Sequence, residues 1–180
     1  MSVTPARTRN PRGEGERLHA DLLDAAADLI AEHRSVDRVS LRAVTVLIAL
    51  WGGRHEHPRL AAEWFVAHAA AGWASCPITQ NGVIRILSAP AYPGARPVSQ
   101  VLAQVQALCD GEHHRFWPDA VSLVDPGVLN PRHVLGLRQL TDAYLLALAV
   151  RQGGRFVTLD GAVTLPAVTG ARPDHLLRLL

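Results

Sequence analysis

Residues 141–160, with the sequence TDAYLLALAVRQGGRFVTLD, decide the fold of this chain. Asp142 opens a segment in which almost every side chain is apolar, which is typical of a helix buried on nearly all sides. Gly153 and Gly154 predict the end of that helix, because a residue without a Cβ adopts the left-handed turn easily. Residues 156–159 then predict a short buried strand, and Asp160 follows at its carboxyl end.

Asp142 and Asp160 form a candidate site at one edge of a sheet. Open α/β sheets place their ligand crevice where strands end and the following helices begin. Each residue also has an ordinary structural interpretation. An aspartate in the first turn of a helix complements the helix dipole, and Asp-Gly after a strand is a common turn. Spacing alone leaves both interpretations open.

Five sequence blocks, taken together, resemble the motif blocks of the PIN-domain ribonucleases, and specifically those of the VapC-type toxins of bacterial toxin–antitoxin pairs. The resemblance spans about residues 44–180 and implies an α/β fold with a PIN-like parallel sheet flanked by helices. In that family, four acidic positions at one end of the sheet hold Mg²⁺ or Mn²⁺ for RNA hydrolysis. The blocks are VTVLIAL from Val44, HEHPRLAAEWF from His55, GWASCPITQNGVIRILSAPAYPG from Gly72, HRFWPDAVSL from His114, and residues 141–160.

The resemblance assigns catalytic and metal-binding roles to Asp142 and Asp160. The first acidic position falls on Ala43 and the second on Gln80, whose neutral carbonyl oxygen is a weaker ligand for a hard cation. Gln80 is equally well an ordinary residue of a helix's first turn. RNA would approach over arginines such as Arg85, for which simple surface charge is the alternative. The expected protein is a Mg²⁺-dependent endoribonuclease toxin of a type II system, impaired by the two substitutions.

The family also implies partners: an RNA substrate, a cognate antitoxin protein and a second copy in a homodimer. A second hypothesis is a catalytically inactive PIN fold that still captures an antitoxin. A third, less favoured hypothesis is a TetR-like DNA-binding regulator.

That third hypothesis rests on the N-terminus. Residues 1–15, with Arg7, Arg9 and Arg12, predict a disordered basic tail, and residues 16–33 predict an amphipathic helix. About residues 12–43 resemble the start of a TetR-type repressor, but no recognition helix follows, so we expect no specific duplex DNA binding. Within this part, RVSLRA alternates as a candidate first strand. We therefore divide the chain into the tail, a TetR-like fragment with that strand over residues 16–43, and a PIN domain over residues 44–180.

Composition adds few constraints. The chain has 180 residues, is 48% hydrophobic and carries a net charge of +2, so one domain with a real core is expected. No apolar run approaches the roughly 18 residues of a membrane span. Cys76 and Cys109 lack metal-motif spacing and form no disulfide framework, which favours a cytoplasmic location.

All 18 basic residues are arginine, an expected result of codon usage in a GC-rich genome. His55, Glu56 and His57 lack the HExxH spacing of a zinc site and are expected to be polar residues at a helix entry.

The remaining segments predict the elements that complete the sheet. Helices are expected over about residues 58–71, from Thr79, and over residues 98–108, with strands at residues 73–76 and 116–117 and a closing helix at residues 173–180. The residues expected to face the core are Leu60, Trp64, Phe65 and Ala67 in the first of these helices and Val101, Leu102, Val105 and Leu108 in the third.

Overall fold

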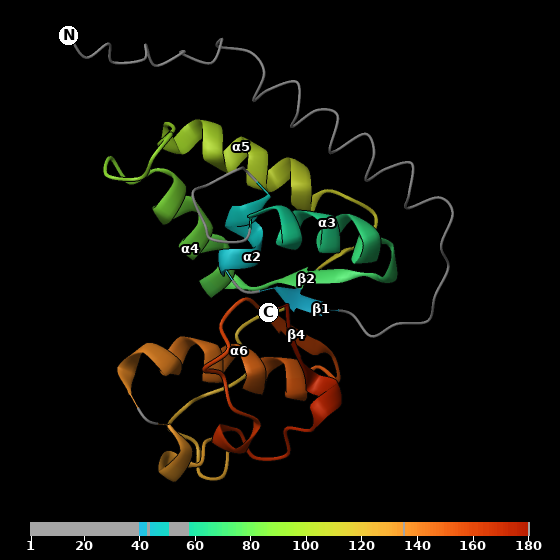
Figure 1. The fold of residues 1–180 in the computed structure, drawn as a ribbon, viewed down its shortest axis with the longest axis vertical. Coiled ribbons are helices and arrows are strands. Elements are labelled where there is room, and N and C mark those ends of the chain that lie inside the picture. Colours follow the sequence, from blue (N-terminus) through green and yellow to red (C-terminus); the bar gives the residue numbers. More distant parts are fainter. Residues whose placement is uncertain (1–39, 43, 51–57, 135, 180) are drawn as a thin grey trace, which may run out of the picture.

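A computed structural model describes residues 40–42, 44–50, 58–134 and 136–179 (Figure 1). Four parts of the sequence analysis lie outside these residues. They are the predicted tail at residues 1–15, the predicted helix at residues 16–33, the first acidic position at Ala43, and the His-Glu-His segment at residues 55–57.

The described residues form a sheet of five parallel strands in the order β3-β2-β1-β4-β5. The chain moves outward from β1 to β3 and then returns to place β4 on the other side of β1. The strand order therefore reverses between β1 and β4. The strands are β1 (Ser40–Arg42), β2 (Trp73–Ser75), β3 (His114–Phe116), β4 (Arg155–Thr158) and β5 (Leu176–Arg178).

Helices cover both faces of this sheet. In Figure 1, α3, α4 and α5 lie above the strands and α6 lies below them. The buried apolar side chains form two clusters: one is centred on α6 and β4 and also includes Val46 and Ala61, and the other lies among α2, α3, α4 and α5. This arrangement confirms the predicted α/β class with a parallel sheet flanked by helices. The helices are α2 (Val44–Ala49), α3 (Pro58–His68), α4 (Pro77–Leu87), α5 (Val98–Cys109) and α6 (Leu140–Arg151).

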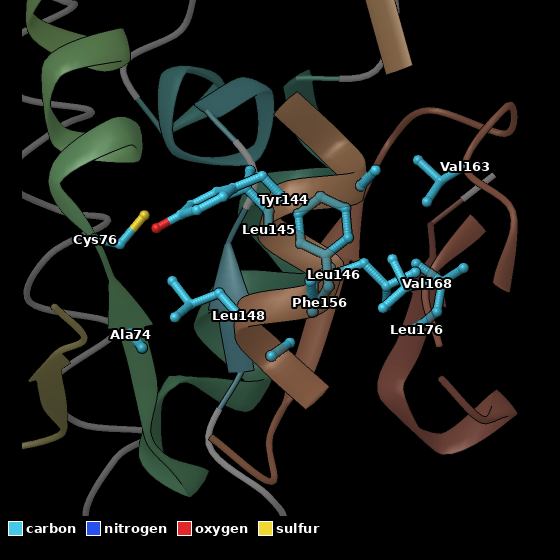
Figure 2. Packing of buried hydrophobic residues seen from close by; sticks show 14 of the residues in the cluster. Ala74, Cys76, Tyr144, Leu145, Leu146, Leu148, Phe156, Val163, Val168 and Leu176 are labelled. Atoms are coloured by element: carbon cyan, nitrogen blue, oxygen red, sulfur yellow. The ribbon is translucent and has the colours of Figure 1, made fainter. Parts of the chain in front are cut away.

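Helix α6 is the central element of the lower layer. All seven residues from 143 to 149 are buried, as the apolar run predicted. Gly153 ends this segment with a φ of 63°, a left-handed conformation that residues with a Cβ seldom adopt. Figure 2 shows why α6 is buried all round: Ala74 and Cys76 lie on one side of the helix, and Val163 and Val168 of the C-terminal segment lie on the other. The helix is thereby fixed at the sheet.

The rotation of two helices differs from the sequence prediction. In α3, Ala61 and Phe65 are buried, whereas Leu60 is 41% exposed and Ala67 is also exposed. In α5, Val101 is fully buried and Leu102 is 48% exposed. Both helices carry apolar residues on more than one side, so the apolar pattern does not define which side meets the sheet.

Several element boundaries also differ. The predicted closing helix is wrong, because a 3₁₀ turn at Pro173–His175 leads into β5, which pairs with β4. The predicted strand at residues 116–117 begins two residues earlier, at His114. Helix α4 starts at Pro77 rather than Thr79, with Cys76 before it.

Both cysteines, Cys76 and Cys109, are free. None of the described helices is long and apolar enough to cross a membrane.

Candidate functional site

The reversal of strand order places two carboxylates at one edge of the sheet. Strands β1 and β4 are parallel neighbours, with Arg42 opposite Val157. Asp160 follows β4 at its carboxyl end, and Asp142 lies in the first turn of α6, the helix that leads back to β4. A helix that precedes a parallel strand runs against it, so its N-terminus reaches the carboxyl edge. This is the position where open α/β sheets bind ligands.

The charges of Asp142 and Asp160 interact. Partial burial, and secondarily the negative charge of Asp160, raises the pKa of Asp142 to about 6. Asp160 itself is exposed and is held by a local turn: its Oδ1 accepts a hydrogen bond of 2.7 Å from the backbone N–H of Ala162. The backbone N–H of Asp160 donates to Thr158 Oγ1, at 3.0 Å. The structure thus places the two predicted site aspartates close enough for their charges to interact, with Asp160 held by a local turn.

Gln80 makes its described side-chain contacts elsewhere. Its Nε2 donates to Ser75 Oγ at 2.9 Å and to Cys109 Sγ at 3.7 Å. Ser75 Oγ also lies 2.8 Å from Nε2 of His114, whose pKa is lowered chiefly by burial. These contacts bind α4 and α5 to the ends of β2 and β3. They do not bring the Gln80 amide nitrogen to Asp142 or Asp160.

Arg85 lies in the last turn of α4 and is exposed. Since α4 starts at Pro77, directly after β2, Arg85 is eight residues along the helix, about 12 Å at 1.5 Å per residue. The structure therefore places Arg85 on the outer surface of the domain, and not at the N-terminal end of α4 beside the strand ends.

Comparison with known proteins identifies relatives over most of the chain. Ribonuclease VapC44 of Mycobacterium tuberculosis (strain H37Rv) is 41% identical over 140 residues, which cover 78% of this chain and 99% of that protein. Ribonuclease VapC38 of the same strain is 40% identical over 144 residues, covering 79% and 100%. Ribonuclease VapC39 is 39% identical over 138 residues, covering 73% and 95%. The chain belongs to the VapC ribonuclease family. No family model matches it.

This VapC family member carries a further carboxylate, within the HRFWPDAVSL block, to which the sequence analysis assigned no role. Asp119 lies three residues beyond the end of β3, and its Oδ1 accepts a 2.5 Å hydrogen bond from the hydroxyl of Tyr144 in α6. Burial, followed by this bond and the charge of Asp119, raises the pKa of Tyr144. One signal was available in the sequence: Asp119 follows a strand closely, as Asp160 does.

The described part of this VapC chain holds no group of three or more His, Cys, Asp or Glu side chains arranged to hold a metal ion. Asp142 and Asp160 are therefore a pair rather than a complete carboxylate cage. Such a pair supplies hard oxygen ligands, and Mg²⁺ is commonly bound through one or two carboxylates together with water.

The raised pKa of Asp142 predicts a pH-dependent loss of stability in this VapC protein. The unfolded carboxyl ionises near its ordinary pKa of 3.8, whereas the folded one ionises at about 6. The folded state therefore binds the proton more tightly, and stability should fall as pH rises from about 4 to above 6. Urea unfolding at pH 4.5 and pH 7.5 measures this fall. In Asp142→Asn the fall should be smaller, and an unchanged fall would contradict the assignment.

Proposed function

We propose that this VapC family protein is a metal-dependent endoribonuclease toxin of a type II toxin–antitoxin system, with activity reduced by its substitutions at two acidic positions. The observation that carries the proposal is the coupled Asp142–Asp160 pair at the switch point of the sheet. Each of the relatives named above is called a ribonuclease. We assign RNA as the substrate on the same basis.

The residues at the switch point fit Mg²⁺ or Mn²⁺. The negative charge of Asp160 favours protonation of Asp142, and a cation bound between the two carboxylates would relieve that repulsion. Asp142 and Asp160 would hold the ion. Gln80 would add a neutral oxygen, since its described hydrogen bonds use only the amide nitrogen. When bound, such an ion activates a water molecule and neutralises charge at the scissile phosphate.

The chain's own contribution is to hold the carboxylates in place. Asp142 is carried by a helix buried on all sides, and Asp160 is carried by a turn that fixes its carboxylate. At neutral pH, above its pKa of about 6, Asp142 is mostly ionised, so its carboxylate can accept a cation. Ala43 removes one carboxylate and Gln80 replaces another by an amide, which weakens the site. RNA would be drawn toward the domain by exposed arginines such as Arg85.

The direct test is metal-dependent cleavage of RNA. Purified protein is incubated with a mixture of structured RNAs in 5′-labelled form, with Mn²⁺, with Mg²⁺ or with EDTA. We expect slow cleavage with either metal, none with EDTA, and none in Asp160→Asn. Asp125→Asn is the matched control, since it removes an exposed aspartate in a turn outside the site. Cleavage that persists in EDTA or in Asp160→Asn would refute the proposal.

The alternative of an inactive PIN fold that binds an antitoxin is favoured by one observation. Among residues 40–42, 44–50, 58–134 and 136–179, no three carboxylates are arranged so that they could hold a metal ion. In that case no RNA is cleaved under any metal condition, while the protein from a neighbouring small reading frame still binds. Co-purification with that antitoxin, together with the cleavage assay, separates the two functions. Light scattering of the purified chain tests the proposed homodimer.

We also propose the domain division. The match to VapC44 covers 99% of that protein but 78% of this chain, so about a fifth of this chain is additional. We assign the additional part to the tail at residues 1–15 and the TetR-like fragment within residues 16–43, with no specific duplex DNA binding. The sheet itself includes residues 40–42, the candidate first strand of that fragment.

Deleting residues 1–35 should leave the melting temperature within a few degrees. Burial of each apolar side chain contributes about 1.5–3 kcal/mol, whereas ordering each residue costs about 1–2 kcal/mol. Because these two contributions oppose each other, an appended amphipathic helix is expected to add little net stability. Thermal unfolding followed by circular dichroism measures the effect. Deleting residues 173–180 is the contrast, because it removes β5 and should abolish cooperative unfolding. Loss of folding on the first deletion would show that the N-terminal part belongs to the core.

A further inference from the structure

The turn that follows β4 fixes the direction of the Asp160 carboxylate. The backbone N–H of Asp160 donates to Thr158 Oγ1 at 3.0 Å, and the backbone N–H of Ala162 donates to Asp160 Oδ1 at 2.7 Å. Asp160 is an exposed residue, so this turn, and not packing around the carboxylate, determines where the carboxylate lies. Any movement of Ala162 therefore moves the carboxylate as well.

Strand β5 holds one side of this turn. Arg178 lies opposite Thr158 in the pairing of β4 with β5. The Arg178 guanidinium donates two hydrogen bonds to the carbonyl oxygen of Val163, from Nε at 3.2 Å and from Nη2 at 2.5 Å. Both donors belong to one planar group, so the bonds fix the direction of this carbonyl as well as its distance. The C-terminal strand, which the sequence analysis expected to be a helix, thus anchors the loop after Asp160.

The start of α6 holds the other side of the turn. The side-chain Nε2 of Gln139 donates to the Ala162 carbonyl oxygen at 3.3 Å. Gln139 directly precedes α6, and Asp142 follows it within one helical turn. Ala162 therefore donates its N–H to Asp160 and accepts at its carbonyl from Gln139. Through this one residue, the segment that carries Asp142 is joined to the turn that carries Asp160.

We propose that Gln139 and Arg178 are positioning residues, which set the spacing of the Asp142 and Asp160 carboxylates so that the pair prefers a small divalent cation to a larger one. This inference rests on the proposed function, in which the pair binds Mg²⁺ or Mn²⁺. Mg²⁺ requires near-octahedral geometry with oxygen ligands at about 2.0–2.1 Å, whereas Ca²⁺ accepts variable geometry at about 2.3–2.6 Å. A carboxylate that moves freely therefore loses more affinity for Mg²⁺ than for Ca²⁺.

The test compares the cation affinities of the intact chain, without any cleavage reaction. Isothermal titration calorimetry measures Mn²⁺ binding, and displacement of Mn²⁺ then gives the affinities for Mg²⁺ and Ca²⁺. Gln139→Met nearly keeps the side-chain length and removes the donor, so it should weaken Mg²⁺ binding by about tenfold, at the low end of the range for groups that orient metal ligands. Ca²⁺ binding should weaken by only about twofold to threefold, because Ca²⁺ tolerates a displaced ligand. Gln106→Met, at an exposed glutamine of α5, is the matched control and should bind both cations as the wild type does.

Arg178→Gln separates positioning from simple charge. Loss of a positive charge alone would tighten the binding of both cations equally, since both carry the same charge. Loss of the two bonds to Val163 instead loosens the turn, so Mg²⁺ binding should weaken by about tenfold and Ca²⁺ binding by less. Arg178→Lys keeps the charge and a donor, and its Mg²⁺ affinity should lie between those of Arg178→Gln and the wild type. Arg151→Gln removes the same charge in the last turn of α6, about 13.5 Å along the helix from Asp142, and should not weaken Mg²⁺ binding.

Amide hydrogen exchange of the metal-free protein reports on the turn directly. The Ala162 N–H is bonded to Asp160 Oδ1, so it should exchange faster in Gln139→Met and in Arg178→Gln than in the wild type. Exchange at Val157, a buried residue of β4, should not change. A purely structural role for the two contacts predicts faster exchange at Ala162 with an unchanged ratio of Mg²⁺ to Ca²⁺ affinity, and that result would overturn the inference.

The outcomes also separate this inference from the proposed function. If Asp160→Asn abolishes Mn²⁺ binding while Gln139→Met and Arg178→Gln keep the wild-type ratio of Mg²⁺ to Ca²⁺ affinity, the positioning role is refuted and the proposed function stands. If the wild type binds no Mn²⁺, the proposed metal-dependent function fails and the inference fails with it. A ratio that falls in both variants, with Gln106→Met and Arg151→Gln unaffected, supports both.

Discussion

Replacing Ala43 by aspartate should strengthen Mn²⁺ binding by at least about tenfold, and metal-dependent RNA cleavage should rise with it. Ala43 lies outside the described residues, but it directly follows Arg42, the last residue of β1, which is paired with Val157 of β4. A direct carboxylate ligand should contribute at least as much as the roughly 10–100-fold of groups that contact a metal only through its ligands. Calorimetry and the labelled-RNA assay measure the two effects.

The same substitution should have the opposite effect without metal. A third negative charge beside Asp142 and Asp160 increases their repulsion, so the metal-free protein should unfold at a lower temperature. Saturating Mn²⁺ should then raise the melting temperature more than it does in the wild type. Ala43→Asn is the matched control, because asparagine has nearly the same size as aspartate but carries no charge. Equal effects of Ala43→Asp and Ala43→Asn would show that the first acidic position is aligned incorrectly.

The central helix and strand could be predicted from the sequence because their signals are local. The apolar run in residues 143–150, the left-handed Gly153 and the following short apolar strand each lie within a few residues of the boundary they define. The positions of Asp142 and Asp160 follow from those boundaries, since one residue begins the helix and the other follows the strand.

Elements defined by distant contacts were not predictable in the same way. The C-terminal sequence LLR at residues 176–178 is compatible with a helix or a strand. It forms a strand because it pairs with β4, where Leu176 lies opposite Phe156, 20 residues earlier in the chain. The rotation of α3 depends on which of several apolar faces meets the sheet. Ala61 takes the buried position and the adjacent Leu60 stays partly exposed.

The candidate site shows the same limit at the level of side chains. Gln80 contacts Cys109, 29 positions away, and Asp119 contacts Tyr144, 25 positions away. A motif fixes where Gln80 lies along the chain but not which group its amide meets. Asp119 belongs to no predicted acidic position, so only the packing of β3 against α6 reveals it.

Replacing Phe156 by alanine should cost about 3–5 kcal/mol of unfolding free energy, the range for a fully buried phenylalanine. Phe156 has no exposed surface and is the largest fully buried side chain among the residues that the structure describes. It lies in β4, whose neighbours on either side are Leu41 and Leu176, and Figure 2 shows its ring beside α6 residues. For a chain of this size the melting temperature should fall by roughly 6–20 °C. Denaturant and thermal unfolding measure both quantities.

Phe116→Ala is the matched control for this prediction. Phe116 is also a phenylalanine in a parallel strand, but it lies in the edge strand β3 and is 52% exposed. Because about half of the Phe116 side chain is buried, its removal should lower the free energy of unfolding by only about 1 kcal/mol. The difference in unfolding free energy between the two variants measures the contribution of the packing between β4 and α6. Because that layer also fixes Asp142 and Asp160, Phe156→Ala should weaken Mn²⁺ binding, whereas Phe116→Ala should not. Similar stability losses in both variants would show that β4 and α6 are not the core that positions the site.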